Sequence, residues 1–134
     1  MKEEEYYKFI QPYQDAKQSV LTRLDALNHT LYGSSAGRPI HNIQDRIKKK
    51  QSMEKKLERK GKEATVENAK DYLMDIAGVR VICYFVDDIY NLAVILKRQA
   101  DLILIRERDY IANPKPNGYR SYHIVVGVPV YCLD

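Results

Sequence analysis

Apolar residues recur along the chain with two different periods, and these periods predict an alternation of helices and strands. Over roughly residues 5–30 they recur three and four positions apart, which predicts one long amphipathic helix. The same period predicts shorter helices over residues 52–60, 66–74 and 86–99. Alternating or β-branched runs predict strands over residues 41–48, 78–85, 102–108 and 122–130. Residues 32–39 are rich in glycine and serine and predict a loop.

Helices and strands in this mixture indicate an α+β domain, in which helices pack around a mostly antiparallel or mixed sheet. The 134 residues have the length of a single domain, and 45% apolar with 30% charged residues is ordinary for a soluble protein. No stretch approaches the roughly 18 apolar residues of a membrane span, and the N-terminus lacks the apolar core of a signal peptide. We therefore expect a cytoplasmic protein without a membrane partner, with Cys83 and Cys132 as reduced thiols.

Positive charge is concentrated in one segment. The chain carries a formal net charge of +4, yet residues 46–62 contain nine basic and two acidic residues, a net charge of +7. The rest of the chain therefore carries −3. One basic site in a mildly acidic protein favours a polyanionic ligand, either a nucleotide or a nucleic acid.

The basic segment combines a strand with a helix. Arg46 and Lys48 are two positions apart on the predicted strand, so their side chains point the same way. On the helix that follows, one hydroxyl and three cations share a face: Ser52, Lys55, Lys56 and Arg59. Met53 and Leu57 lie on the opposite side and anchor the helix. Strand and helix could aim their cations at one cleft, as a triphosphate with a divalent ion requires. The alternative is a solvated, lysine-rich surface helix.

Two charged residues flank the start of the strand predicted over residues 78–85. Asp75 precedes this strand, and Arg80 points to the face opposite Val81 and Cys83. A buried charge needs a partner or a ligand, so the two residues either form a structural ion pair or bind a ligand. In the second case Asp75 is a hard oxygen ligand for Mg²⁺, and Arg80 is a flat cation that stacks on a base.

A stiff loop precedes the last predicted strand. Residues 113–123 read NPKPNGYRSYH, in which two prolines and an Asn-Gly pair fix a turn. Lys115, Tyr119 and Arg120 suit an anionic and flat ligand such as a nucleotide, with lysine for a phosphate and the aromatic ring for a base. An ordinary basic turn is the alternative, and a lone histidine such as His123 is more often structural than catalytic.

Three motifs occur in order over about residues 41–127. They read HNIQDRIKKKQSMEKKLERKG, DIAGVRVICYF and RDYIANPKPNGYRSYH. Together they resemble the synthetase domain of the RelA/SpoT family, and most closely its stand-alone branch, the small alarmone synthetases. The resemblance implies a nucleotidyltransferase-like α+β fold, a mixed sheet flanked by helices, with a nucleotide-binding core over about residues 41–130. It implies transfer of the β,γ-pyrophosphoryl group of ATP to the ribose 3′-hydroxyl of GDP or GTP.

The resemblance also implies a role for each matching residue. Arg46 and Arg80 would sandwich the adenine of ATP, and Asp75 would take part in catalysis as the ligand of Mg²⁺. The phosphates of ATP would be held by Lys48, Ser52, Lys55, Lys56 and Arg59. Tyr119 would stack on guanine. The other contacts with GDP or GTP would come from Arg108, Lys115, Asn117 and His123.

One motif of the family does not occur in these 134 residues. The family carries a catalytic glutamate on a later strand, in a motif like E-[IV]-Q-[IL]-R, and the sequence reaches Asp134 without it. Glu107 precedes the nucleotide loop and does not replace it. A fragment of a longer protein is preferred over a natural truncation, because the last apolar strand would otherwise form an unpaired edge. We therefore expect weak or no pyrophosphoryl transfer by the 134 residues alone.

Other functions remain open. An enzyme of the same fold could pyrophosphorylate tRNA ends or make an adenosine alarmone, since function belongs to the site and not to the fold. Alternatively, the basic segment could bind RNA without catalysis, with an affinity that falls steeply with salt and needs no Mg²⁺. The resemblance also implies that the full-length protein is a homotetramer.

Overall fold

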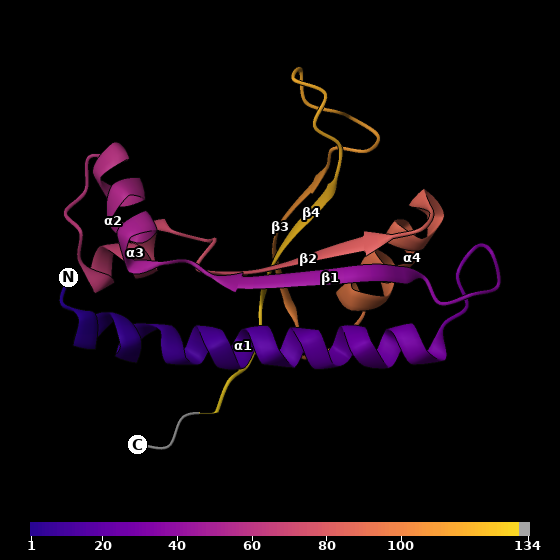
Figure 1. Ribbon diagram of the computed structural model, residues 1–134, viewed down its shortest axis with the longest axis horizontal. Helices are drawn as coiled ribbons and strands as arrows, with labels where there is room; N and C mark the ends of the chain where they lie inside the picture. Colours follow the sequence, from indigo (N-terminus) through magenta and orange to yellow (C-terminus); the bar gives the residue numbers. More distant parts are fainter. Residues whose placement is uncertain (132–134) are drawn as a thin grey trace. The chain divides into compact units, whose positions relative to one another are not determined.

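The computed structural model describes residues 1–131, and its elements follow the predicted order (Figure 1). They are α1 (Glu3–Thr30), β1 (Ile40–Ile47), α2 (Lys50–Arg59), α3 (Val66–Tyr72), β2 (Ala77–Cys83), α4 (Val86–Lys97), β3 (Ile103–Asp109) and β4 (Tyr122–Gly127). β1 pairs with β2, and β3 pairs with β4. The predicted α+β class is confirmed, as is each predicted helix and strand.

The chain divides into two compact units. Among the described residues, the first contains Met1–Thr22, Gln44–Arg80, Val130 and Tyr131, and the second contains Arg23–Ile43 and Val81–Pro129. α1, β1 and β2 each contribute residues to both units. Within residues 1–131, no helix is long and apolar enough to cross a membrane.

Cys83 is a free thiol in the second unit, as predicted, whereas Cys132 lies outside the described residues. Burial is the main cause that raises the pKa of Cys83 to about 11, and the charge of Asp88 adds to it. The thiol is therefore protonated at neutral pH and is a poor nucleophile.

Several element boundaries differ from the predicted ones. α3 ends at Tyr72 rather than at residue 74, and β4 ends at Gly127 rather than at residue 130. The first helix begins at Glu3, close to the predicted start at residue 5, and it continues through Pro12 although proline removes a backbone hydrogen bond from a helix interior.

β1 and β2 run antiparallel. In the first unit the Lys48 N–H donates to the Ile76 carbonyl at 2.7 Å, and in the second unit the Tyr84 N–H donates to the Pro39 carbonyl at 3.3 Å. The apolar run over residues 78–85 is typical of a central strand, yet three of its side chains are exposed: Ile82, Tyr84 and Phe85. The described residues give β2 one neighbouring strand, and a two-stranded sheet leaves much of its surface uncovered.

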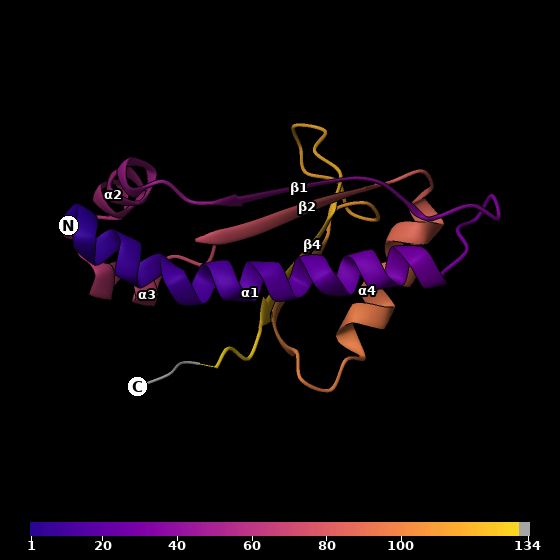
Figure 2. The same ribbon diagram turned by 60° about the horizontal axis from the view of Figure 1, so that its bottom comes forward.

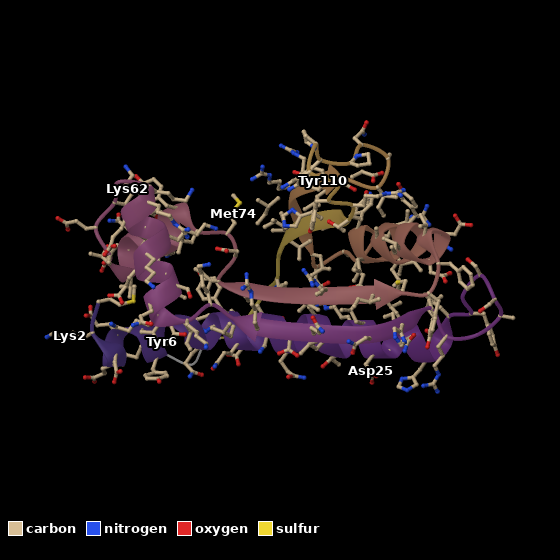
Figure 3. The ribbon with its side chains drawn as sticks, turned by 45° about the horizontal axis from the view of Figure 1, so that its top comes forward. Lys2, Tyr6, Asp25, Lys62, Met74 and Tyr110 are labelled. Atoms are coloured by element: carbon tan, nitrogen blue, oxygen red, sulfur yellow. The ribbon has the colours of Figure 1, made fainter. Side chains whose placement is uncertain are left out.

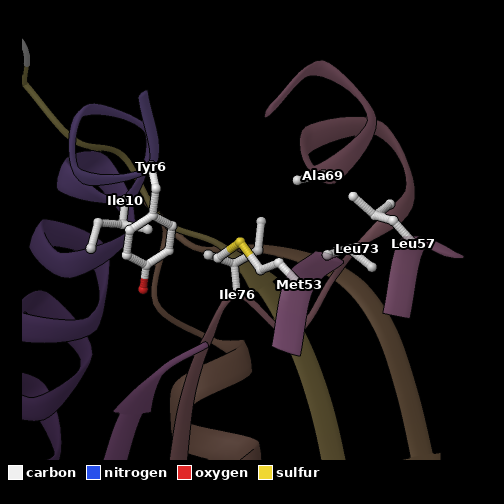
Figure 4. Close-up of a cluster of buried hydrophobic side chains, with 7 residues drawn as sticks. All are labelled: Tyr6, Ile10, Met53, Leu57, Ala69, Leu73 and Ile76. Atoms are coloured by element: carbon white, nitrogen blue, oxygen red, sulfur yellow. The ribbon is translucent and has the colours of Figure 1, made fainter. Parts of the chain in front are cut away.

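The core of the first unit lies where the first turns of α1 meet α2 and α3, which Figures 1 and 2 both show side by side. Its buried side chains are Tyr6, Ile10, Met53, Leu57, Ala69, Leu73 and Ile76 (Figure 4). Met53 and Leu57 are fully buried, as their spacing on α2 predicts. The Tyr6 hydroxyl donates to the Lys48 carbonyl at 2.8 Å. This core therefore fixes the junction between β1 and α2.

In the second unit, β3 and β4 form an antiparallel hairpin. Its register runs from Ile103 opposite Gly127 to Asp109 opposite Tyr122. Residues 110–121 connect the two strands as the loop at the end of the hairpin (Figure 1). The loop that the sequence predicts to bind a nucleotide therefore lies at the end of the hairpin, next to the last residue pair of the β3–β4 ladder.

α4 buries a carboxylate that the sequence analysis did not single out. Asp88 is 2% exposed, and its Oδ1 accepts hydrogen bonds from the N–H and the hydroxyl of Ser34, at 2.9 and 3.0 Å. Leu92 and Ala93 of the same helix are also buried. Asp88 therefore ties the loop over residues 32–39 to α4.

Candidate functional site

The residues predicted to bind nucleotides fall into two groups, one in each unit. We call the first group the basic cluster; it contains Arg46, Lys48, Ser52, Lys55, Lys56, Arg59, Asp75 and Arg80. We call the second group the loop cluster; it contains Arg108, Lys115, Asn117, Tyr119 and His123.

An ion-pair network forms the centre of the basic cluster. Asp75 Oδ2 accepts hydrogen bonds from the Lys48 ammonium at 3.1 Å and from the Lys56 ammonium at 3.0 Å. Lys48 directly follows β1, Lys56 lies on α2, and Asp75 lies between α3 and β2. The alternative of an ion pair between Asp75 and Arg80 is wrong, because the two lysines bind the carboxylate instead.

α2 presents the polar face that its sequence predicts. Its four expected ligands are exposed or half-buried: Ser52, Lys55, Lys56 and Arg59. At the start of the helix, Lys49 is extended and makes no capping hydrogen bond with its side chain, and the first turn contains no acidic residue. Ser52 therefore lies at the positive end of the helix dipole. Because the first turn carries no carboxylate to offset that positive charge, this end of the helix favours an anion.

One oxygen of Asp75 lacks a hydrogen-bond partner. Oδ1 is buried and unpaired among the described residues, whereas Oδ2 binds both lysines. Burial opposes the ionisation of Asp75, but the hydrogen bonds and charges of Lys56 and Lys48 outweigh it and lower the pKa of Asp75. The carboxylate is therefore ionised at neutral pH.

The surroundings of Asp75 fit a magnesium ion that arrives together with phosphates. A buried, unpaired carboxylate oxygen is a hard ligand of the kind that Mg²⁺ prefers. In the described part of the chain, no group of three or more His, Cys, Asp or Glu side chains could hold a metal by itself. Mg²⁺ commonly takes one or two protein carboxylates and completes its shell with water and substrate phosphates, so one carboxylate is sufficient.

Arg46 and Arg80 are exposed on the paired strands β1 and β2. The Arg46 side chain passes close to Gly78, since a Cβ at that glycine would lie 3.8 Å from Arg46 Cγ and Nε. Val79 and Val81 on either side of Arg80 are half-buried, so Arg80 points to the opposite face, as predicted. Each arginine thus offers a flat cation on the sheet surface.

The loop cluster contains a lysine held close to two tyrosine rings, one of which, Tyr110, is labelled in Figure 3. The Lys115 ammonium lies 4.8 Å from the ring centre of Tyr110 and 5.3 Å from that of Tyr119. The two rings meet edge to face, with their centres 6.0 Å apart. Tyr119 is 44% exposed, and the Ser121 hydroxyl donates to the Tyr119 hydroxyl at 2.9 Å. Tyr119 is therefore held in one orientation while part of it stays accessible.

The Asn-Gly pair forms the turn that its sequence predicts. Gly118 has a φ of +87°, in the left-handed region that favours glycine, and its N–H donates to the Lys115 carbonyl at 2.8 Å. Asn117 Oδ1 accepts a hydrogen bond from the Tyr119 N–H at 3.0 Å. The side-chain oxygen of Asn117 is therefore used within the loop, and its amide nitrogen is the group left to donate to a ligand.

Arg108 and His123 lie opposite each other in the β3–β4 ladder, and both are exposed. They form the next pair after Asp109 and Tyr122, where the ladder ends and the loop begins. The hairpin therefore brings these two predicted ligands to the base of the loop.

Two residues at the start of the loop were missed by the sequence analysis. The Tyr110 ring lies beneath the Lys115 ammonium. Asp109 Oδ1 accepts hydrogen bonds from the N–H groups of Ile111 and Ala112, each at 3.0 Å. The sequence does contain a signal for the role of Asp109, because an aspartate at the end of a strand commonly accepts hydrogen bonds from the backbone N–H groups two and three residues ahead.

The chain is similar to known proteins over the region that contains both clusters. The chain matches the region found in RelA / SpoT proteins over residues 45–132, which include every residue of the basic and loop clusters. It is 42% identical over 124 residues to the GTP pyrophosphokinase YwaC and 32% identical over 134 residues to the GTP pyrophosphokinase YjbM, both from Bacillus subtilis (strain 168). These alignments cover 92% and 100% of this chain but 56% and 62% of the relatives, so the chain spans about three fifths of their length.

Two solved structures are similar to the chain throughout most of its length. The small alarmone synthetase 1 from Bacillus subtilis, bound to its product pppGpp, aligns with a TM-score of 0.83 and 32% identity, over 96% of this chain and 64% of that one. A GTP pyrophosphokinase family protein from Streptococcus pneumoniae aligns with a TM-score of 0.80 and 36% identity, over 94% and 61%. The predicted nucleotidyltransferase-like fold is thereby confirmed, and the chain belongs to the RelA/SpoT family.

Proposed function

We propose that this chain forms the nucleotide-binding part of an enzyme that transfers a pyrophosphoryl group from ATP to GDP or GTP. The observation that carries the proposal is Asp75, whose Oδ2 forms ion pairs with two lysines while its Oδ1 is buried and unpaired among the described residues. Such an arrangement suits a triphosphate that binds with a divalent ion. Support also comes from two relatives that are named GTP pyrophosphokinases and from a similar structure that contains pppGpp.

The basic cluster binds ATP in this proposal. Arg46 and Arg80 are flat cations on neighbouring strands, and they enclose the adenine. The phosphates are held by Lys48, Ser52, Lys55, Lys56 and Arg59. The 3′-oxygen of the acceptor forms a bond to the β-phosphorus and its hydroxyl gives up a proton to a base, the role expected for the glutamate of the family motif. The bond from that phosphorus to the oxygen shared with the α-phosphate breaks, and AMP leaves with that oxygen. The cations stabilise the charge on the transferring oxygens and on the leaving group.

Asp75 would hold Mg²⁺, which supplies further neutralisation of the phosphate charge when it is bound. Lys48 and Lys56 both donate to Asp75 Oδ2. If Asp75 held a metal ion, its charge would be shared with that ion, and the two ammonium groups would be freer to bind the phosphates of ATP.

The loop cluster binds the acceptor nucleotide. Tyr119 stacks on the guanine through its accessible part, a contact that contributes about 1–3 kcal/mol. Lys115 and the amide nitrogen of Asn117 bind polar groups of the nucleotide, and Arg108 and His123 contribute from the base of the loop. The rigid turn at Gly118 keeps these groups in a fixed relation before the nucleotide arrives.

Binding of the two nucleotides is the direct test. The family's glutamate motif does not occur in the 134 residues, so we expect the chain to bind substrates without robust transfer. Calorimetry should detect ATP binding in the presence of Mg²⁺ and, in a separate titration, GDP or GTP binding. A chain that binds neither nucleotide would refute the proposal. In a chain extended to include the glutamate motif, GTP, ATP and tRNA as competing acceptors would separate guanosine-directed transfer from the adenosine- and tRNA-directed alternatives.

A second candidate function is RNA binding without catalysis, and the net charge of +7 over residues 46–62 favours it. This function needs neither the unpaired oxygen of Asp75 nor the ordered Tyr119. It predicts an affinity for RNA that falls steeply with salt and does not change when Mg²⁺ is removed. Mg²⁺-dependent ATP binding with weak RNA binding would exclude it.

A further inference from the structure

We propose that Tyr90, which lies on α4 and outside both predicted clusters, is a positioning residue for the loop that carries Tyr119. The inference rests on the proposed function, because it assigns Tyr90 a part in binding guanine nucleotides. The Tyr90 hydroxyl donates to Asp109 Oδ2 at 2.8 Å. Asp109 is the last residue of β3, so Tyr90 holds a carboxylate at the point where the loop over residues 110–121 begins.

Asp109 in turn fixes the first turn of this loop. Its Oδ1 accepts the N–H groups of Ile111 and Ala112, and its carbonyl accepts the N–H of Asn113 at 3.2 Å. The hydrogen bond from Ala112 is the main cause that lowers the pKa of Asp109; those from Tyr90 and Ile111 add to it and outweigh burial. The carboxylate is thus ionised, with one oxygen bound to the loop and the other to α4. It cannot rotate without losing one of these contacts.

The turn held by Asp109 sets the position of Tyr110. The Tyr110 N–H donates to the Ser121 carbonyl at 2.7 Å, which closes the base of the loop. The Tyr110 ring then contacts both groups that the proposed function uses, the ammonium of Lys115 and the ring of Tyr119. A continuous series of contacts therefore leads from Tyr90 through Asp109 and Tyr110 to the proposed stacking residue.

Tyr90 is itself held firmly enough to act as an anchor. Its ring meets the Tyr122 ring edge to face, with centres 5.6 Å apart and planes at 86°. Tyr122 is the partner of Asp109 in the ladder, and the Lys97 ammonium of α4 also binds its hydroxyl at 3.2 Å. The ring of Tyr90 therefore packs on the hairpin independently of its hydroxyl, so a phenylalanine keeps the packing and loses only the bond to Asp109.

Loss of this bond should reduce the fraction of molecules in which the loop is ordered for binding. The observed affinity for the acceptor falls in proportion to that fraction. We expect Tyr90→Phe to weaken GDP binding by about threefold to tenfold. ATP binding should stay unchanged, because the basic cluster belongs to the first unit and contains no residue of this series.

The experiment compares Tyr90→Phe with Tyr84→Phe in the full 134-residue chain. Tyr84 is a matched control: its hydroxyl lies 3.1 Å from His41 Nδ1, its ring is exposed, and it belongs to the same unit. Calorimetric titrations give the affinities for GDP and, separately, for ATP with Mg²⁺. Amide hydrogen exchange reports the protection of Ile111 and Ala112, which is a readout of the loop that needs no ligand.

The expected result is weaker GDP binding and faster exchange of these two amides in Tyr90→Phe, with unchanged ATP binding, while Tyr84→Phe matches the parent. Unchanged GDP affinity or unchanged exchange in Tyr90→Phe would overturn the inference and leave the proposed function standing. Loss of ATP binding in Tyr90→Phe would also overturn it, because the effect would then be global. Absence of GDP binding in the parent chain would instead refute the proposed function, and the inference with it.

Discussion

Replacing Asp75 with asparagine should strengthen the binding of ATP when no metal is present. In the parent chain Lys48 and Lys56 both bind Asp75 Oδ2, so an incoming phosphate has to displace the carboxylate and approach its negative charge. Asparagine keeps the shape of the side chain and removes the charge. With Mg²⁺ present, the parent should bind ATP more tightly than Asp75→Asn, because its carboxylate would then bind the metal that accompanies the phosphates.

The magnitude follows from the distances and the exposure of the two ion pairs. At an effective dielectric constant of about 20, unit charges about 3 Å apart attract by roughly 5.5 kcal/mol. Solvent screens most of this, because the side chains of Asp75 and Lys56 are 36% and 32% exposed, and exposed pairs typically contribute about 0.2–1 kcal/mol. The Lys48 side chain is only 10% exposed, so the contribution of its ion pair should lie at the upper end of that energy range. The two pairs together give about 1–2 kcal/mol, or roughly 5- to 30-fold in affinity.

Isothermal titration calorimetry at one fixed ionic strength would measure this effect, first with a chelator and then with saturating Mg²⁺. Asp71→Asn is the matched control, since Asp71 is exposed on α3 in the same unit and lies outside the basic cluster. The reasoning is refuted if Asp75→Asn binds metal-free ATP no more tightly than the parent. It is also refuted if Asp71→Asn gains as much, because a general change in net charge would then explain the gain.

Three further predictions concern binding and stability. Tyr119→Ala should weaken GDP binding by about 5- to 150-fold and leave ATP binding unchanged in calorimetry, since stacking on a base contributes about 1–3 kcal/mol; equal losses for both nucleotides would contradict this. Leu57→Ala should lower the free energy of unfolding by about 2–5 kcal/mol in urea denaturation, because Leu57 is fully buried, whereas the half-exposed Leu104→Ala should cost less than about 1 kcal/mol. The pKa of Asp75 lies below its ordinary value of 3.8, so its ion pairs stabilise the folded chain above about pH 4 and this contribution is lost as the pH falls through the folded-state pKa. The difference in unfolding free energy between the parent and Asp75→Asn should therefore shrink below pH 4, and a constant difference from pH 7 to pH 3 would contradict the assignment.

The helices and strands could be predicted from the sequence because their apolar periods are clear and their ends carry recognisable signals. α2 shows this well: Met53 and Leu57 are four residues apart and fully buried, and Gly61, with a φ of +72°, follows the end of the helix. The turn at Gly118 could be predicted for the same local reason. Local chemistry decides such features, so a sequence window of a few residues contains the information.

Pairings between distant residues could not be predicted in this way. Asp75 was weighed against Arg80, five positions along the chain, but its partners are Lys48 and Lys56. Lys48 is brought near by its backbone hydrogen bond to Ile76, and Lys56 by the packing of α2 in the core that contains Ile76. Asp88 looks like an ordinary acid in the first turn of a helix, which normally faces solvent. It is buried because Ser34, 54 positions earlier, folds onto it.

The Lys115 ammonium over the Tyr119 ring has a consequence for the direction from which a flat ligand can approach. An aromatic ring in open solvent offers two equivalent sides for stacking. Here a cation lies over one side, so in the proposed function an incoming base would have to stack on the side away from Lys115. The base and its sugar would then approach from that side, a restriction that a freely rotating tyrosine would not impose.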